Sequence, residues 1–404
     1  MGGDPDEDDD WRLREPHPEP PLWAEEPEAP AWARGLLPAP SSTLSRPVPG
    51  SALRPSFLRA LCEAEDVLSR LDASALAAPA AVREGLAARL AFREAAGWLA
   101  HAEAWVHPLD LALRDLGLTG SYAAAALSGK LRSALPATVT SGSVTGWTPE
   151  DPDSLPEDRR VGVALAFARA LRRLATATSW KPLASTEAAA EAVRPLGGVV
   201  GPRAFATWKA AWKVAAERGS PLLAALAAAG GWRAVEAERE MQLAEAGQPV
   251  ASSEAERRQR AGLVAAAALV ACGRLRAIPL PLWAAIPGRP ASGWRDDPRF
   301  GAEPDTLITA LRQIAEAARG ATRELDRLLD AAEAGAKLTA GLDRRSRLPD
   351  AVEAVLRAPA ITPTALARRL GVVPQTATDL CRQMTRAGVV REATGRRSFR
   401  AFAA

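Results

Sequence analysis

Hydrogen-bonding and basic side chains gather on one edge of the segment between Pro374 and Ala387. The side chains that we expect to face outward are Gln375, Thr376, Thr378, Asp379, Arg382 and Arg386. A glutamine amide can pair with the edge of an adenine through two hydrogen bonds, and arginine side chains bind phosphate oxygens. This combination is typical of a surface that contacts the bases and backbone of double-stranded DNA.

Three helices that each begin near a proline must position these side chains. Their predicted ranges are Pro349–Arg357, Pro363–Leu370 and Pro374–Ala387. Thr362 is a good N-cap for the middle helix, and Gly371 is a good end for it because a left-handed cap favours a residue without Cβ. This spacing predicts a helix-turn-helix, in which the N-terminal part of the last helix enters the major groove.

Small and apolar residues are expected to hold the last helix in place. Ala367 lies four residues before Gly371, where a small side chain lets the two helices cross closely, and Val373, Ala377 and Leu380 should face the core. The outer face then divides into base-contacting Gln375, Thr376 and Thr378 and phosphate-contacting Arg368, Arg369, Arg382 and Arg386.

Two short runs that favour β-structure follow, at Val389–Ala393 and Ser398–Phe402, around a turn that contains Gly395. They predict a hairpin, or wing, whose basic residues Arg396, Arg397 and Arg400 would lie along the DNA backbone or in the minor groove. Two alternatives stay open. The segment could be the end of a helical bundle with a solvated basic face, or a winged helix that docks onto a protein.

Charge is unevenly distributed along the 404 residues, although the formal net charge is only +3. Residues 1–50 contain eleven acidic and four basic residues, whereas residues 341–404 contain twelve arginines and five acidic residues. An acidic segment at one end and a basic one at the other are typical of a tail and a nucleic-acid-binding region.

Composition favours a mainly α fold, because Ala, Leu and Arg dominate and the chain has one Tyr and no Asn.

We expect a disordered, acidic and Pro-rich tail (1–50), a helical domain (51–304), a long helix with a basic hinge (305–344) and a winged helix-turn-helix (345–404). Loops are predicted at 136–157 and 277–304. The helices expected before the C-terminal domain are a first one from Pro55, then Ala80–Trp105, Glu157–Thr176, Pro202–Glu217, Pro221–Ala229, Trp232–Ala246, Ser253–Cys272 and Asp305–Ala336. A short segment, Leu109–Leu116, follows the second of them.

Cysteine use and hydropathy indicate a cytoplasmic protein without a membrane partner. Cys62, Cys272 and Cys381 have no metal-binding or disulfide spacing, and the acidic N-terminus is unlike a signal peptide. The apolar stretch Ala261–Cys272 is too short to span a bilayer. No metal or other cofactor is predicted.

Several residues outside the basic region could in principle do chemistry. His101 and His107 flank Trp105, with Asp110 and Asp115 nearby, but two histidines six residues apart across a proline do not share a helix face. We therefore favour a packed or hydrogen-bonded structural role over a metal or acid–base site.

Three other features have a structural and a functional interpretation. The glycine cluster Gly197–Gly201 precedes a helix start, where an anion could bind, but it is more typical of a loop. Trp208 and Trp212 lie one helical turn apart and favour core packing over ligand sensing. Cys381 favours burial over redox sensing, because no second cysteine lies near it in the sequence.

Two segments of the chain resemble a known family. The C-terminal one comprises Ser346-Arg347-Leu348-Pro349, Ile361–Gly371, Thr394-Gly395-Arg396 and Phe399-Arg400-Ala401-Phe402, and the upstream one comprises Ala91–Ala95 and Val106–Asp115. They resemble an uncharacterised alphaproteobacterial family with a helical domain of unknown function and a helix-turn-helix DNA-binding domain. The resemblance covers most of residues 55–404, is strongest at 80–117 and 345–404, and implies DNA binding without a known reaction.

The C-terminal segment is also similar to the winged helix of Fic-type adenylyltransferases. Fic catalysis uses a His followed by a Gly-Asn-Gly-Arg anion cradle, whereas this chain has no Asn and only His17, His101 and His107. We therefore expect no adenylylation.

The sequence as a whole predicts a transcriptional regulator that binds double-stranded DNA as a homodimer and is not an enzyme. The helical domain would dimerise or receive a signal, and no effector is indicated. The long helix Asp305–Ala336 could form a dimer seam or pack inside one chain. The alternatives are an interaction protein, for example in plasmid maintenance or a toxin–antitoxin pair, and a degenerate Fic-like protein.

Overall fold

The computed structural model describes residues 55–101, 106–116, 157–177, 179–248, 254–280, 304–343, 345–393 and 400–404. Within these ranges the protein is mainly α-helical and has one two-stranded sheet near its C-terminus, which confirms the predicted fold class. The predicted acidic tail lies outside the described residues, as do Trp105 and most of the two predicted loops.

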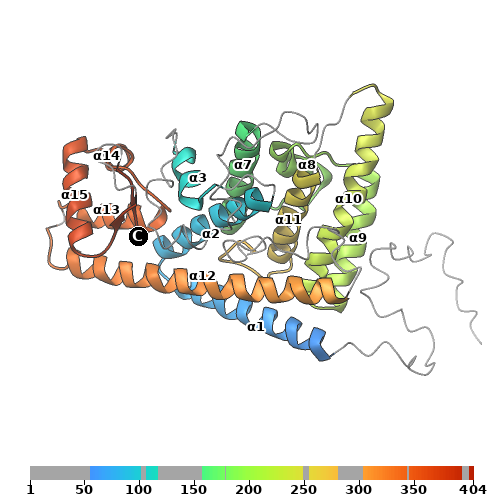
Figure 1. The fold of residues 1–404 in the computed structure, drawn as a ribbon, viewed down its shortest axis with the longest axis horizontal. Helices are drawn as coiled ribbons and strands as arrows, with labels where there is room; N and C mark the ends of the chain where they lie inside the picture. The colour runs from blue at the N-terminus through green and yellow to red at the C-terminus, as the bar shows by residue number, and fades with distance from the viewer. Residues whose placement is uncertain are drawn as a thin grey trace, which may run out of the picture.

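A single long helix runs beneath most of the molecule in Figure 1. This helix, α12 (Pro304–Thr339), packs along α1 (Pro55–Ala77) and also contacts α2 (Ala80–His101). Its predicted apolar stripe is buried, and Leu311, Ile314 and Leu328 are 0% exposed. The stripe therefore packs inside one chain and is not available as a dimer seam.

The middle of the molecule is built around α2. Helix α7 (Glu157–Thr176) packs against it, and so does the short helix α3 (Pro108–Asp115). Trp98 of α2 and Phe167 of α7 are each 1% exposed, as expected for large side chains at a helix–helix contact.

The far end of the body contains α9 (Pro202–Arg218), α10 (Pro221–Glu245) and α11 (Glu254–Ala271), with α10 packed against both of the others. The short helix α8 (Thr186–Val193) and the 3₁₀ turn η1 (Arg194–Leu196) lie beside them. Trp208 and Trp212 are buried with ring centroids 6.0 Å apart, and Trp208 Nε1 donates to Ala228 O at 2.9 Å. The core-packing interpretation of these tryptophans is confirmed.

Two expectations for this end of the body were wrong. Helix α10 continues through Gly230-Gly231, where two separate helices were predicted, because Gly231 and Trp232 are buried between neighbouring helices whose packing outweighs the low propensity of glycine. Helix α8 was not predicted, although Ser185 caps it by accepting a hydrogen bond from Ala188 N at 3.2 Å. Its eight residues are too few for a clear periodic pattern.

The C-terminal part of the chain, residues 348–404, is called the head from here on. It contains α13 (Leu348–Arg357), α14 (Pro363–Leu370), α15 (Pro374–Arg386) and the strands β1 (Arg391–Glu392) and β2 (Phe402–Ala403). The strands pair antiparallel, with Arg391 opposite Ala403, and Ile361 forms a further bridge to Phe402. The predicted hairpin is thus present, with shorter strands than the sequence runs suggested.

A buried arginine joins the head to the body. Arg89 of α2 donates from Nη1 to Leu356 O at 3.1 Å, in the last turn of α13, and its Nε lies 3.4 Å from Glu324 Oε1 of α12. Burial lowers the pKa of Arg89 to about 10, so the guanidinium remains charged at neutral pH. A Cβ on Gly85 would lie 1.9 Å from Leu356 O, so only glycine permits this close approach of α13 to α2.

A second contact between head and body involves α3. Leu109 and Leu113 of α3 pack with Ala360, before α14, and Ala401, before β2. The stretch Val106–Asp115, to which no chemistry was assigned, therefore supports the head.

None of the helices in the described ranges is both long and apolar enough to cross a membrane.

Candidate nucleic-acid interface

The α14–turn–α15 unit forms where its capping residues predict. Thr362 Oγ1 accepts a hydrogen bond from Ala365 N at 3.1 Å, and Pro363 occupies the first turn of α14. Gly371 has φ +65° and donates its N–H to Ala367 O, which closes the end of α14 in the left-handed conformation. These three local signals fix where the turn lies and where α15 starts.

The inner face of this unit is apolar. Leu366, Ala377, Cys381 and Met384 are each 0% exposed. Val373, predicted as a core anchor, is instead 64% exposed, because it occupies the extended N-cap position of α15 and its side chain lies outside the packed face. The prediction for Val373 was wrong, and those for Ala377 and Leu380 are confirmed.

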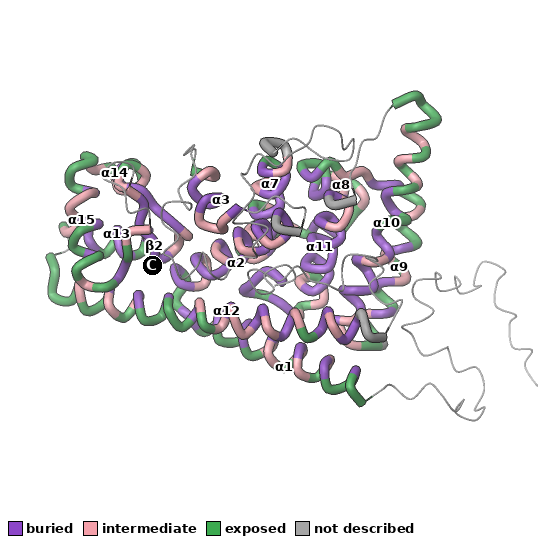
Figure 2. Tube along the Cα trace, in the orientation of Figure 1, coloured by how far each residue is buried: buried purple, intermediate pink, exposed green. Residues whose placement is uncertain are grey.

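The outer face presents most of the predicted contact residues to solvent. Figure 2 shows exposed segments along α14 and α15, at one end of the molecule. The exposed side chains are Gln375, Thr376, Arg382, Arg386, Arg368 and Arg369. The body does not cover this face. Gln375 is exposed, and Thr378 is half-buried.

Thr378 differs from its neighbours in how its hydroxyl is used. The Oγ1 atom donates to Pro374 O, one turn earlier, at 2.9 Å. Its hydrogen is therefore engaged within α15, and the hydroxyl keeps only acceptor capacity for an external donor.

A short network links three polar side chains along the outer edge of α15. Asp379 Oδ1 accepts from Gln375 Nε2 at 3.4 Å and from Arg382 Nη1 at 2.8 Å. The spacing of these residues places them on one face of the helix, one turn apart. Asp379 thus holds both a predicted base-contacting and a predicted phosphate-contacting side chain.

The hairpin is described only in part. Arg400 is half-buried, and its Nε lies 3.6 Å from Glu392 Oε1 across the two strands. The predicted contact residues Arg396 and Arg397 lie outside the described residues. Glu392 therefore offsets part of the positive charge of Arg400.

Cys381 lies on the inner face of α15 and is 0% exposed. Burial raises the pKa of its thiol from 9.0 to about 12, which keeps it protonated at neutral pH. This environment fits the packing role and offers no reactive thiolate.

His107 has the structural role that the sequence favoured. It is the N-cap of α3, and its Nδ1 accepts a hydrogen bond from Leu109 N at 3.1 Å. Burial, followed by the nearby charges of Arg391 and Arg93, lowers the pKa of His107 and favours the neutral ring that this hydrogen bond requires. Arg391 belongs to β1, so this cap lies close to the head.

The acidic residues near His107 do not form a metal centre. Asp115 Oδ1 lies 2.7 Å from Arg169 Nε, and Asp115 Oδ2 lies 3.6 Å from Arg172 Nη1. Within the part of the chain that the structure describes, no group of three or more potential metal ligands comes together.

The glycine cluster Gly197–Gly201 is a loop whose neighbouring helix start is occupied. Glu238 Oε2 accepts from Ala204 N, in the first turn of α9, at 2.7 Å. A Cβ on Gly201 would lie 2.2 Å from that carboxylate oxygen. The carboxylate takes the position in which an external anion would bind, so the loop interpretation is supported.

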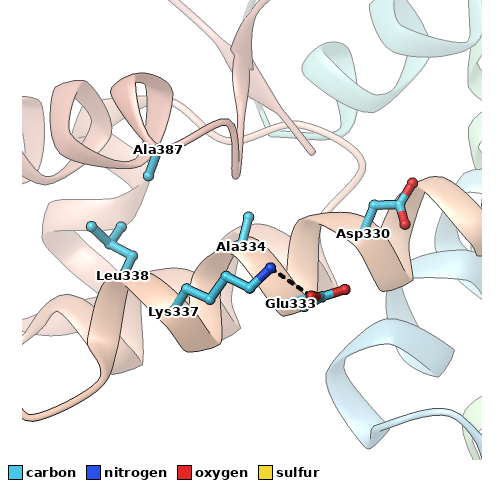
Figure 3. A pocket seen from close by; sticks show the side chains of 6 residues that line it. All are labelled: Asp330, Glu333, Ala334, Lys337, Leu338 and Ala387. Atoms are coloured by element: carbon cyan, nitrogen blue, oxygen red, sulfur yellow. Dashed lines mark ion pairs between the residues drawn. The ribbon is translucent and has the colours of Figure 1, made fainter.

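A pocket lies where α12 passes the end of α15 (Figure 3). Its volume is about 520 Å³, and it is lined by Asp330, Glu333, Ala334, Lys337, Leu338 and Ala387. Lys337 Nζ lies 2.6 Å from Glu333 Oε1. The pocket is therefore lined by two carboxylates and one ammonium group, unlike the outer face of α14 and α15 with its exposed arginines.

Two residues were missed as contributors to the outer face. Asp379 was placed on that face but given no role, although its spacing from Gln375 and Arg382 is the i, i+3 and i+4 pattern that brings side chains together on a helix. Val373 was predicted to lie in the turn before Pro374 and to face the core, but at this N-cap position its side chain is exposed.

Comparison with protein-family models gives a match within the head. Residues 348–403, which run from α13 to β2, match the family model described as an HTH DNA binding domain. No curated protein matches the chain. The matched range does not reach the resemblance at residues 80–117. The C-terminal head is therefore a helix-turn-helix domain of the DNA-binding type.

Proposed function

We propose that the chain is a sequence-specific DNA-binding protein that regulates transcription. The observation that carries this proposal is that a helix-turn-helix of the DNA-binding type keeps the polar edge of α15 uncovered on a head held firmly by the body. Such an edge can enter a major groove without rearrangement of the head.

The proposed contacts divide by chemistry. Gln375 and Thr376 reach base edges, and Thr378 accepts from a base amino group. Arg368, Arg369, Arg382 and Arg386 neutralise phosphates, with Arg396, Arg397 and Arg400 of the hairpin contributing along the backbone. Phosphate contacts supply most of the affinity, and the base contacts supply the choice of sequence.

Regulation would come from occupancy of the DNA and not from a chemical reaction. A bound protein of this size excludes or recruits other proteins at its site. We propose that the body serves dimerisation or signal input, since α2 and α12 both contact the head through α13. A homodimer would bind two half-sites related by twofold symmetry.

The test uses the full chain and selection of bound fragments from random or genomic duplex DNA. We expect one enriched motif whose affinity falls with salt by roughly 0.9 log unit per tenfold salt for each phosphate neutralised. Twofold symmetry in the motif would support the dimer, and a single asymmetric half-site would refute it.

A matched pair of variants makes the test sharper. Arg369→Ala should weaken binding to all sequences and reduce the slope of log affinity against log salt concentration by about 1. Arg327→Ala, at an exposed arginine of α12, should leave the affinity and this slope unchanged. Failure to enrich any motif, or equal effects of the two substitutions, would overturn the proposed function.

A further inference from the structure

We propose that Val373 is a specificity-determining residue that packs against the 5-methyl group of a thymine in the major groove. This inference rests on the proposed function and deepens it, since it assigns one side chain of the turn to one chemical group of the DNA. Thymine is the only standard base that presents a methyl group in that groove.

The exposure of Val373 is the first observation that supports it. At 64%, it is the most exposed of the large hydrophobic side chains in the described ranges, ahead of Met241 at 60%. Single exposed apolar residues are ordinary on protein surfaces, so exposure alone assigns nothing. Its position within the head supplies the rest of the argument.

Val373 also occupies a position where valine is a poor choice for stability. It is the N-cap of α15 and makes no side-chain capping hydrogen bond, and the first turn of α15 has no acidic residue. Ser185, Ser220 and Thr362 cap α8, α10 and α14 with a side-chain oxygen, whereas the N-caps of α9 and α13 share with Val373 the absence of a side-chain capping bond. One residue thus departs from two local preferences, for burial and for capping, and such departures concentrate at functional sites.

The location of Val373 brings it to the groove. The N-terminal end of the second helix of a helix-turn-helix is the part that approaches the base edges. Val373 lies directly before this end, beside the exposed Gln375 and Thr376 and after the exposed Arg368 and Arg369. A head that is positioned by its arginines therefore brings the valine methyl groups toward the floor of the groove, where a thymine methyl would cover them.

The experiment replaces thymines one at a time by deoxyuridine in the selected DNA site and measures binding of the full chain. Deoxyuridine keeps every hydrogen-bonding group of thymine and lacks only the methyl group. One such replacement should weaken binding by the wild-type chain roughly fourfold, the value for one buried methyl-sized group. Val373→Ala should weaken binding to the unmodified site by a similar factor and should abolish the effect of that one replacement.

Val214→Ala is the matched control, because Val214 is an exposed valine on α9 of the body. It should leave the deoxyuridine effect intact. If the wild-type chain selects a motif but tolerates deoxyuridine at every thymine, or if the losses from Val373→Ala and deoxyuridine simply add, the inference on Val373 is overturned while the proposed function stands. If the wild-type chain selects no motif, both are overturned.

Discussion

The amide of Gln375 contacts a neighbouring carboxylate on the outer face of α15. Its Nε2 donates to Asp379 Oδ1 at 3.4 Å, which leaves the Oε1 acceptor and one N–H without a role in this contact. An acceptor and a donor side by side are what the N6 and N7 edge of adenine requires. The contact with Asp379 thus leaves the amide groups that adenine pairing needs.

Replacement of Gln375 by alanine should affect one base position of the selected site. We expect Gln375→Ala to cost about 1–3 kcal/mol of binding free energy at that base pair and little elsewhere. The measurement is a titration against a set of single-base variants of the site. Gln383→Ala, at an exposed glutamine two turns further along α15, is the control. Uniform losses across all variants of the site would contradict base contact by Gln375.

The thiol of Cys381 should be unreactive in the folded protein. Its pKa of about 12 leaves almost no thiolate at pH 8, whereas Cys62 is exposed. Because the pKa of Cys381 is higher in the folded state than its ordinary value of 9.0, its contribution to stability is complete below pH 9 and is lost between about pH 9 and pH 12. Alkylation at pH 8 followed by peptide mass spectrometry should find Cys62 modified and Cys381 protected. Equal labelling of the two cysteines would show that the inner face of α15 opens readily.

The turn between α14 and α15 depends on the left-handed conformation of Gly371. Apart from its immediate chain neighbours, no residue comes within 4 Å of an added Cβ, so the cost of a substitution there comes from the positive φ and not from packing. We expect Gly371→Ala to lower the free energy of unfolding by about 1–3 kcal/mol. Gly371→Asn should lower the free energy of unfolding by less, because asparagine adopts the left-handed conformation more readily than alanine. Urea unfolding followed by tryptophan fluorescence measures both, and an alanine variant as stable as the wild type would contradict this account of the turn.

The elements that the sequence predicted well are those whose signals are local. Thr362, Gly371 and Pro374 mark the helix-turn-helix by capping and backbone geometry alone, and the stripe of α12 follows from its period. Helix α10 could not be predicted through Gly230-Gly231, because its continuity depends on α9 and α11. Val373 was misplaced because apolar character predicts burial, whereas its N-cap position keeps the side chain outside the packed face of α15.

The junction of head and body is a feature that only the whole molecule reveals. Arg89 and Leu356 are 267 residues apart in sequence, and no periodic or capping signal connects them. The same holds for Leu113 and Ala401, which meet where α3 supports the head. Long-range contacts of this kind fix the orientation of α15 relative to the body, and they lie beyond what local patterns can predict.

Loss of Arg89 should destabilise the whole chain. Arg89→Met removes the donor to Leu356 O and leaves Glu324, which is 15% exposed, without its buried partner. Breaking a buried ion pair typically costs about 3–5 kcal/mol, and we expect the lower end because Glu324 also pairs with Arg327. Arg70→Met, which breaks an exposed pair with Asp66, should have little effect. Urea unfolding provides the comparison, and equal midpoints for the two variants would refute a stabilising role for the junction.

The core shared by head and body also has a consequence for synthesis of the protein on the ribosome. Chains fold from the N-terminus as they emerge, so α2, α3 and α12 are available before the head is complete. The head is translated last and then packs against these helices of the body through Leu356, Ala360 and Ala401. A chain that stops before Ala401 would lack β2 and part of its contact with α3, so prematurely terminated products would hold the head less firmly on the body.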